Sequence, residues 1–328
     1  MIYLNCDYNE GAQERIIERL AQTNLEQSVG YGQDAYCEKA AELIREKCGK
    51  PKAGVHFLVG GTQTNETVIT ALLRPYQGVI APDTGHISTH ETGAIEAGGH
   101  KVLTLPGTDG KLTAEQVEAC YLAHAEDETR EHMVQPGMVY ISQPTEWGTL
   151  YSLAELKALS QVCRRYGLIL YADGARLGYG LTGQDNDVSL SNMAELCDIF
   201  YIGGTKVGAL FGEAVVIPDV RLQQDFRYMM KQKGGLLAKG RLLGLQFLAL
   251  FEDDLYCEGA AHGNCMADQI RETLKALQVP FWVENCTNQI FPILPDAVWK
   301  KLGEKYCFSY EKRISETESV MRICTSWA

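Results

Sequence analysis

Short apolar runs alternate with segments of helical periodicity through the first 240 residues of the chain. Helices are expected where apolar positions recur every three to four residues, at residues 13–22, 35–47, 65–73, 114–125 and 153–166. Strands are expected at the short apolar runs, at residues 54–59, 78–81, 101–105, 138–142, 168–172 and 199–202. Strands that are apolar on both faces and alternate with helices are typical of a mostly parallel sheet flanked by helices. The predicted fold class is therefore α/β.

The pattern changes near residue 236. A long helix is expected there, followed by separate strands at residues 280–283, 289–294 and 321–325. This order predicts a smaller C-terminal α+β domain, and we divide the chain into an N-terminal arm with a large domain, residues 1–240, and a small domain, residues 241–328. Ligands of open parallel sheets gather beyond the carboxyl ends of the strands, so candidate chemistry is sought there.

Charge and composition narrow the class of partner. Forty-two acidic against 30 basic side chains give a net charge of −12, which disfavours nucleic acids and anionic membrane surfaces as partners. The chain starts without a targeting pattern and contains no run of about 20 apolar residues, so a cytoplasmic location is expected. The 11 cysteines are scattered without a Cys-x-x-Cys pair, which favours reduced thiols over disulfides or zinc. A small molecule is the expected partner.

The strand at residues 168–172 runs into Asp-Gly-Ala-Arg at residues 173–176. A desolvated carboxylate remains ionised only beside a cation, and the protonated pyridine nitrogen of a cofactor is one such cation. Alternatively, Asp173 pairs with Arg176 or caps the next helix. This stretch by itself leaves both interpretations open.

A lysine follows the next strand, in Gly-Gly-Thr-Lys at residues 203–206. Where water is scarce a lysine loses its proton more readily, and the neutral amine can form an imine with an aldehyde. A solvated loop lysine is one alternative to this role for Lys206. A phosphate-binding P-loop is another, but that motif requires Ser or Thr after the lysine, whereas here threonine precedes it.

Two further segments offer candidate ligands. The Gly-Gly-Thr turn at residues 60–62 follows a strand and opens a helix, so it could hold a phosphate or form a plain helix cap. His86 and His90 are four residues apart, but the zinc-protease order His-Glu-x-x-His and a third ligand are missing, so no metal is expected. We expect His86 to stack on a planar ring, with a hydrogen-bonded structural histidine as the alternative.

Taken in order, these elements resemble the fold-type-I pyridoxal 5′-phosphate (PLP) enzymes, which are PLP-dependent transferase-like in fold. Within them the chain resembles the threonine aldolase and β-eliminating lyase family, in the branch of low-specificity threonine and phenylserine aldolases. The resemblance spans nearly the whole chain and is sharpest at residues 173–176 and 203–206. Supporting matches are Tyr-Gly-Gln-Asp at 31–34, Gly-Thr at 61–62, Thr-Glu-Trp-Gly-Thr-Leu-Tyr at 145–151 and Met-Arg-Ile-Cys-Thr-Ser at 321–326.

The resemblance implies roles for individual residues. Lys206 would hold PLP covalently as a Schiff base, with Asp173 at the ring nitrogen and His86 over the ring, and these three are the expected catalytic residues. Further cofactor contacts are expected from Gly61, Thr62, Arg176 near the phenolic oxygen, and Arg241 near the phosphate, with Lys231 and Lys239 as other basic candidates.

The resemblance also implies substrate contacts. They are expected from Cys6, Tyr31, Glu146 and Arg322, and Arg322 would clamp the substrate carboxylate. Tyr31 lies near a subunit boundary in the family, which implies a homodimer or homotetramer. Many relatives have a histidine near the substrate hydroxyl, but this chain has Pro-Thr-Glu at residues 144–146, so the group that takes the hydroxyl proton is left open.

The expected activity is cleavage of a β-hydroxy-α-amino acid of the L-threonine or allo-threonine type to glycine and an aldehyde. β-Elimination or transamination of another amino acid on the same cofactor is the alternative among enzymes. A catalytically silent PLP-fold binding protein is an alternative of another class, although such a protein would have little need of Lys206, Asp173 and Arg322 together. A nucleotide-binding α/β protein would require a P-loop or dinucleotide fingerprint, and neither is found.

Overall fold

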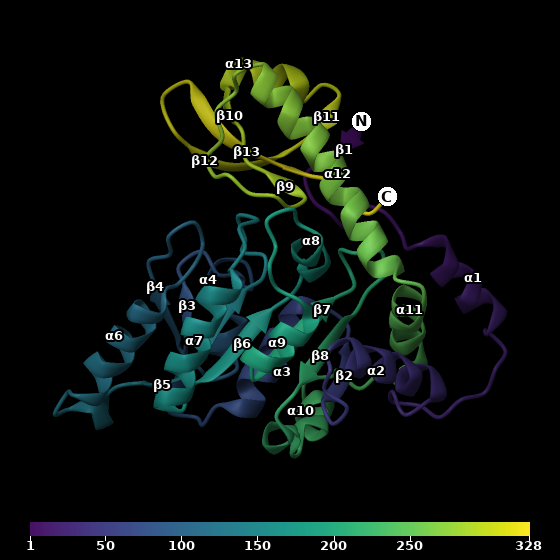
Figure 1. Ribbon diagram of the computed structural model, residues 1–328, viewed down its shortest axis with the longest axis vertical. Coiled ribbons are helices and arrows are strands. Elements are labelled where there is room, and N and C mark those ends of the chain that lie inside the picture. Colours follow the sequence, from purple (N-terminus) through teal and green to yellow (C-terminus); the bar gives the residue numbers. More distant parts are fainter.

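A seven-stranded sheet forms the centre of the larger part of the computed structural model, which describes residues 1–328 (Figure 1). Its strand order is β2-β8-β7-β6-β5-β3-β4, and only β8 runs antiparallel to its neighbours, so the prediction of a mostly parallel α/β sheet is confirmed. The strands are β2 Gly54–Leu58, β3 Gln77–Pro82, β4 Val102–Leu105, β5 Gln135–Ser142, β6 Ile169–Asp173, β7 Ile199–Gly203 and β8 Glu213–Ile217. β8 was not predicted; because the loop before it is too short for a crossover helix, it pairs antiparallel with β7.

Helices cover both faces of this sheet. On one face a core of 43 buried side chains includes residues of α2, α6, α7, α9 and α11, and on the other a core of 17 includes residues of α3, α5 and α10, so the strands are apolar on both sides. The helices are α2 Ala35–Lys47, α3 Gly61–Leu72, α5 Ala94–Ala97, α6 Ala114–Ala125, α7 Leu153–Tyr166, α9 Leu190–Leu196, α10 Phe226–Gln232 and α11 Arg241–Glu252. α7 shows why such segments are helical: a capping box of Ser152 and Glu155 starts it, and Gly167 in the left-handed conformation ends it.

The C-terminal part contains a second, smaller sheet. Helix α12, Leu255–Ala276, leads to it, and its strands follow the order β10-β13-β12 with β9 paired to β13 (Figure 1). The elements are β9 Gln289–Ile290, β10 Ile293–Pro295, α13 Asp296–Leu302, β12 Ser309–Arg313 and β13 Glu318–Cys324. The predicted smaller α+β part is thus confirmed, whereas the strand expected at residues 280–283 was wrong, because only an isolated bridge joins Phe281 to Pro292.

The helix expected from residue 236 is two helices. α11 ends at Glu252, and Asp254 adopts a φ of 60° before α12 begins, so the chain turns between them. α11 packs against α2 within the large core, although it lies just past residue 240. The division of the chain into domains at that residue stays a prediction.

The N-terminal segment joins the two parts. β1, Ile2–Tyr3, pairs with β11, Tyr306–Cys307, beside the small sheet (Figure 1). The Leu4 carbonyl accepts a hydrogen bond from the Cys324 amide at 2.8 Å, and α1, Glu14–Gln22, then packs on α11. Residues 5–8 therefore lie between the small sheet and the large one. No helix of the chain combines the length and apolarity that crossing a bilayer requires.

Candidate active site

Asp173 is a buried carboxylate without a cation in contact. Its Oδ2 accepts hydrogen bonds from the Tyr140 hydroxyl at 2.7 Å and the Asn65 amide at 3.1 Å, and its Oδ1 accepts from the Tyr201 hydroxyl at 2.5 Å and the Ala175 amide at 3.0 Å. Burial raises the pKa of Asp173, but the charge of His86 and these hydrogen bonds outweigh burial and lower it. A charged carboxylate is therefore held at the carboxyl end of β6 by neutral donors.

The two tyrosines beside Asp173 are firmly protonated. Burial and the charge of Asp173 raise the pKa of Tyr140 and of Tyr201 well above the ordinary value, so both remain hydroxyl donors. The alternative in which Asp173 pairs with Arg176 does not occur, because Arg176 binds another carboxylate.

Lys206 follows β7 in a tight loop that a buried glutamate holds. Glu213 at the start of β8 accepts hydrogen bonds from the Thr205 hydroxyl at 2.9 Å and the Gly204 amide at 3.2 Å. Burial raises the pKa of Glu213 to about 8, although Thr205 and the charge of Lys206 oppose this. Lys206 itself forms no ion pair, and its Nζ lies 5.9 Å from the centre of the Tyr8 ring.

His86 begins the short helix α4, His86–Thr89, and is oriented by a buried acid. Its Nδ1 lies 2.7 Å from Glu91 Oε1, which also accepts from the Asn65 amide at 2.6 Å, and the same amide donates to Asp173. Burial lowers the pKa of His86, but Glu91, Glu146 and Asp173 outweigh it and raise the pKa. A chain of hydrogen bonds thus connects His86 to Asp173 through Glu91 and Asn65.

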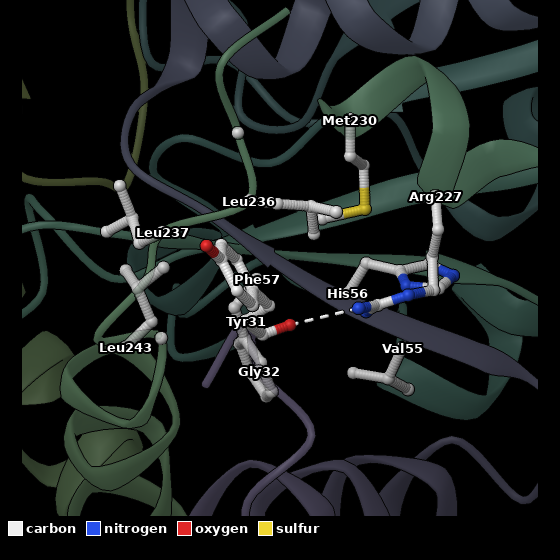
Figure 2. A pocket seen from close by; sticks show the side chains of 12 residues that line it. Tyr31, Gly32, Val55, His56, Phe57, Arg227, Met230, Leu236, Leu237 and Leu243 are labelled. Atoms are coloured by element: carbon white, nitrogen blue, oxygen red, sulfur yellow. Dashed lines mark hydrogen bonds between the residues drawn. The ribbon is translucent and has the colours of Figure 1, made fainter. Parts of the chain in front are cut away.

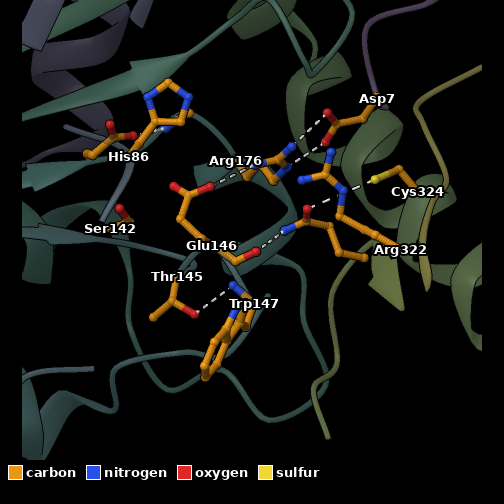
Figure 3. A network of polar contacts seen from close by, with 12 residues as sticks. Asp7, His86, Ser142, Thr145, Glu146, Trp147, Arg176, Arg322 and Cys324 are labelled. Atoms are coloured by element: carbon orange, nitrogen blue, oxygen red, sulfur yellow. Dashed lines mark hydrogen bonds and ion pairs between the residues drawn. The ribbon is translucent and has the colours of Figure 1, made fainter. Parts of the chain in front are cut away.

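Arg176 is held in a fork by Asp7 of the N-terminal segment. Its Nε and Nη2 donate to the two oxygens of Asp7 at 2.7 and 3.0 Å (Figure 3). The Asn288 side-chain amide also donates to Asp7, at 2.9 Å. Burial raises the pKa of Asp7, but Arg176 and Lys206 lower it to about 2. Burial lowers the pKa of Arg176, but the charges of Asp7 and Glu146 outweigh burial and hold that pKa above the ordinary value. The pair joins the turn after β6 to the N-terminal segment.

Arg322, on β13, offers an unused donor edge. Its Nη2 makes only two long contacts of 3.4 Å, to the Asn5 carbonyl and the Ser309 hydroxyl, and its buried Nε has no partner. The Nε and Nη2 edge of a guanidinium matches the two oxygens of a carboxylate. Arg322 is therefore arranged to bind an anion that the chain itself does not supply.

Glu146 and Cys6 lie beside the ion pair of Arg176 and Asp7. The carboxylate of Glu146 points toward Arg176, 3.9 Å from its Nη1, on the side where His86 lies (Figure 3). Cys6 is buried next to Asp7, and its thiol donates to the Asn9 side chain at 3.1 Å.

The Gly-Gly-Thr turn begins α3. Gly60 is extended, Gly61 is the first helical residue, and the first-turn amides of Gly61 and Thr62 have no partner within the helix. A Cβ at Gly61 would lie 3.2 Å from the Tyr201 hydroxyl, so the turn lies against the tyrosine that binds Asp173. The amides at this helix start are thus available to an anion close to Asp173.

Tyr31 and Arg241 make their contacts elsewhere. Tyr31 lines a cavity of about 30 Å³ with His56, and its carbonyl accepts a hydrogen bond from Arg227 at 3.0 Å (Figure 2). Lys231 Nζ lies 4.8 Å from the centre of the Tyr31 ring. Arg241, at the start of α11, donates to the Thr23 carbonyl at 2.6 Å, and its buried Nη1 has no partner. Within one chain the structure does not join these two residues to the group around Asp173.

Several residues of the site were not assigned a role from the sequence. They are Asp7, Asn65, Glu91, Tyr140, Tyr201, Glu213 and Asn288. Asn65 and Glu91 lie within the segments that contain Gly61 and His86, so their proximity in the chain was a usable signal. Tyr140 and Tyr201 each lie within an apolar strand, so the sequence pattern indicates core residues. The structure buries both of them in the core on one face of the sheet.

The fold and the site together define a PLP-dependent enzyme of fold type I. A mostly parallel sheet places an ionised aspartate, a loop lysine and a helix start with free amides at the carboxyl ends of its strands, and the small sheet adds an arginine. The donor set fits the cofactor, because Asp173 is a buried anion that lacks a cation and either tyrosine hydroxyl can rotate to admit one.

Comparison with known proteins narrows the class to a family. The family model described as "Beta-eliminating lyase" matches residues 6–296. A low-specificity L-threonine aldolase of Pseudomonas sp. (strain NCIMB 10558) is 33% identical over 276 residues, which cover 84% of this chain and 76% of that protein. The chain belongs to the β-eliminating lyase family.

Solved structures agree with this assignment. A threonine aldolase from Leishmania major has a TM-score of 0.97 and 44% identity, covering 100% of this chain and 95% of that one. A methionine aminotransferase from Escherichia coli has a TM-score of 0.76 at 15% identity, covering 98% of this chain and 89% of that one, which shows the shared fold alone. The same fold thus hosts both reactions, so the residues of the site must decide between them.

Proposed function

We propose that the protein is a PLP-dependent aldolase that cleaves a β-hydroxy-α-amino acid of the L-threonine or allo-threonine type to glycine and an aldehyde. The observation that carries the proposal is the set of charges without ion-pair partners: Asp173 lacks a cation, and Lys206 and Arg322 lack anions. PLP and the carboxylate of an amino acid together supply the missing charges. The similarity to threonine aldolases supports this choice of reaction.

Four parts of the chain would hold the cofactor. Lys206 would attach to it covalently, the amides at Gly61 and the hydroxyl of Thr62 would bind its phosphate, and His86 would cover its ring. Asp173 would keep the ring nitrogen protonated, because its carboxylate is charged and shielded from water. When bound, PLP supplies an electron sink for the pair released at the substrate Cα.

The substrate would be oriented by its carboxylate. Arg322 would bind it through the Nε and Nη2 edge, which fixes the direction of the Cα–Cβ bond relative to the rest of the site. Arg176 is already engaged by Asp7, so we assign it to shaping the site and balancing charge near the ring.

We further propose that the protein works in the cytoplasm as a homodimer or homotetramer. Exposed apolar side chains support an assembly, since Leu25 is 93% and Val29 is 64% exposed on the segment that leads to Tyr31. A second copy covering this segment would also reach Tyr31, whose side chain is partly exposed in the single chain.

The proposed activity is tested by supplying PLP and substrate to the purified protein. We expect an absorbance band near the visible edge that borohydride bleaches, and aldehyde release from L-threonine or L-allo-threonine. A bleachable band without aldehyde from either amino acid or from phenylserine would move the reaction to elimination or transamination. A protein with no band after addition of PLP would contradict the proposal entirely.

Arg322→Ala is expected to raise the KM for the amino acid about 10- to 100-fold, because a charge-assisted pair contributes about 1.5–3 kcal/mol. The turnover number should fall less than kcat/KM does. Steady-state kinetics measure both constants, and Arg221→Ala is the control because the side chain of Arg221 is 89% exposed. An unchanged KM would place carboxylate recognition at another residue.

A further inference from the structure

Glu146 differs from the other carboxylates of the site in having free acceptor capacity. Asp7 is bound by Arg176 and Asn288, Glu91 by His86 and Asn65, Glu213 by Thr205 and the Gly204 amide, and Asp173 by four donors. The carboxylate of Glu146 accepts no hydrogen bond, and its one ionic neighbour, Arg176 Nη1, is 3.9 Å away. Asp7 occupies the Nε and Nη2 edge of Arg176, so Glu146 faces only the remaining Nη1.

The backbone around Glu146 is fixed on both sides. Gln289 donates to the Glu146 carbonyl at 3.2 Å, and Asn285 donates to the Trp147 carbonyl at 2.9 Å, so the small sheet and the segment before it hold the loop. The Trp147 amide donates to the Thr145 hydroxyl at 3.3 Å (Figure 3). These hydrogen bonds position the loop before any substrate binds. The Glu146 side chain is 17% exposed, so its carboxylate remains accessible to a substrate.

Two other ionisable side chains of the site, those of His86 and Tyr8, have raised pKa values. The pKa of His86 is raised: burial lowers it, but the hydrogen bond to Glu91 and the charges of Glu146 and Asp173 outweigh burial and favour the imidazolium form. The pKa of Tyr8 is raised chiefly by burial, to which the charge of Asp7 adds, so its phenol remains neutral. The carboxylate of Glu146, by contrast, has lone pairs that no donor of the chain occupies, so it can accept a hydrogen bond from a substrate hydroxyl.

We propose that Glu146 is the catalytic base that takes the proton of the substrate β-hydroxyl. This inference rests on the proposed aldolase function. As the O–H bond breaks, its electron pair becomes the second C–O bond of the aldehyde, the Cα–Cβ bond breaks with its pair left at Cα, and the proton moves to Glu146. After the aldehyde leaves, Cα takes a proton to give glycine, and Glu146 returns its proton to solvent.

The test separates the hydroxyl step from the rest of the reaction. Exchange of the glycine Cα hydrogen with deuterium oxide involves the same cofactor and carboxylate site but no hydroxyl. Glu146→Gln is expected to reduce the kcat for threonine cleavage by about 10²- to 10⁴-fold and to reduce glycine exchange far less. Calorimetric affinity for glycine, which needs no turnover, should change by less than about threefold.

Two further variants complete the experiment. Glu146→Ala with added formate should regain cleavage in proportion to formate concentration, since a free carboxylate can replace the missing one. Glu284→Gln is the matched control, because the Glu284 side chain is 70% exposed and pairs only with Lys275.

Three results would overturn the inference. Cleavage by Glu146→Gln at the wild-type rate would assign the proton to another group, and an equal loss of cleavage, exchange and glycine affinity would make Glu146 a residue that only shapes the site. Absence of aldehyde from the wild-type protein would overturn the proposed function and this inference with it, whereas wild-type cleavage with an unaffected variant overturns the inference alone.

Discussion

Lys206→Ala is expected to lose the borohydride-sensitive absorbance and at least about 10³-fold of the activity, because no other amine takes the place of the attacking nucleophile. The fold should be unaffected. Lys206 forms no ion pair, and its backbone carbonyl, which accepts from the Tyr179 hydroxyl at 2.7 Å, is still present in the alanine variant. Absorbance spectra before and after borohydride, with mass spectrometry of the reduced protein, measure the covalent bond.

The matched control for this substitution is Lys157→Ala. Lys157 lies exposed on α7 and makes no ion pair, so its replacement should leave spectrum and turnover as in the wild type. Thermal unfolding of the cofactor-free proteins checks that Lys206→Ala folds. If Lys206→Ala retained a band that borohydride bleaches, PLP would be attached to another lysine. Lys231 and Lys239 would be the first to be tested.

Asp173→Asn is expected to lower turnover by about 10²- to 10⁴-fold while changing cofactor affinity much less. A neutral amide cannot hold a positive charge at a ring nitrogen, so the electron sink would lose its proton. The amide also presents a donor where the carboxylate accepts from Tyr140 and Tyr201, so one of these hydroxyls must rotate away. This conflict should reduce the free energy of unfolding by about 1–3 kcal/mol.

Steady-state kinetics, PLP titration and denaturant unfolding measure the three effects of Asp173→Asn separately. The control is Asp109→Asn, because Asp109 is exposed and its φ of 51° is a conformation that asparagine also tolerates. Turnover within a few-fold of the wild type would remove Asp173 from the ring nitrogen, whatever the variant does to stability.

Local pattern was sufficient for most of the large sheet. Strands β3, β5, β6 and β7 were predicted because each is a short apolar run. Asp173 ends β6, and Lys206 lies in the loop after β7. β8 and the break between α11 and α12 were missed. Both depend on turns, at residues 204–212 and at Asp254, and turn residues give a weaker signal than periodicity.

The roles of individual site residues were harder to predict from the sequence than the strands were. Lys206, Asp173 and His86 were singled out because they stand close to strand ends within recognisable motifs, and their roles stay predictions. Glu213 was missed, since a glutamate that opens an apolar strand reads as a solvated strand end, and only its burial against Thr205 shows otherwise. Tyr31 and Arg241 have contacts within one chain that do not test their predicted roles.

The amino-acid sequence by itself determined the order of helices and strands, the parallel sheet and the residues at its carboxyl ends, because hydrophobic periodicity and strand-end motifs are local properties. Tertiary structure decided which charges meet. Asp7 and Arg176 are 169 residues apart, and Asp7 and Asn288 are 281 apart. No local pattern specifies such pairs. They form because the N-terminal segment lies between the two sheets, where an unpaired buried charge is costly. Arg322 and Asp173 have no ion-pair partner in the chain, so they remain available to ligands.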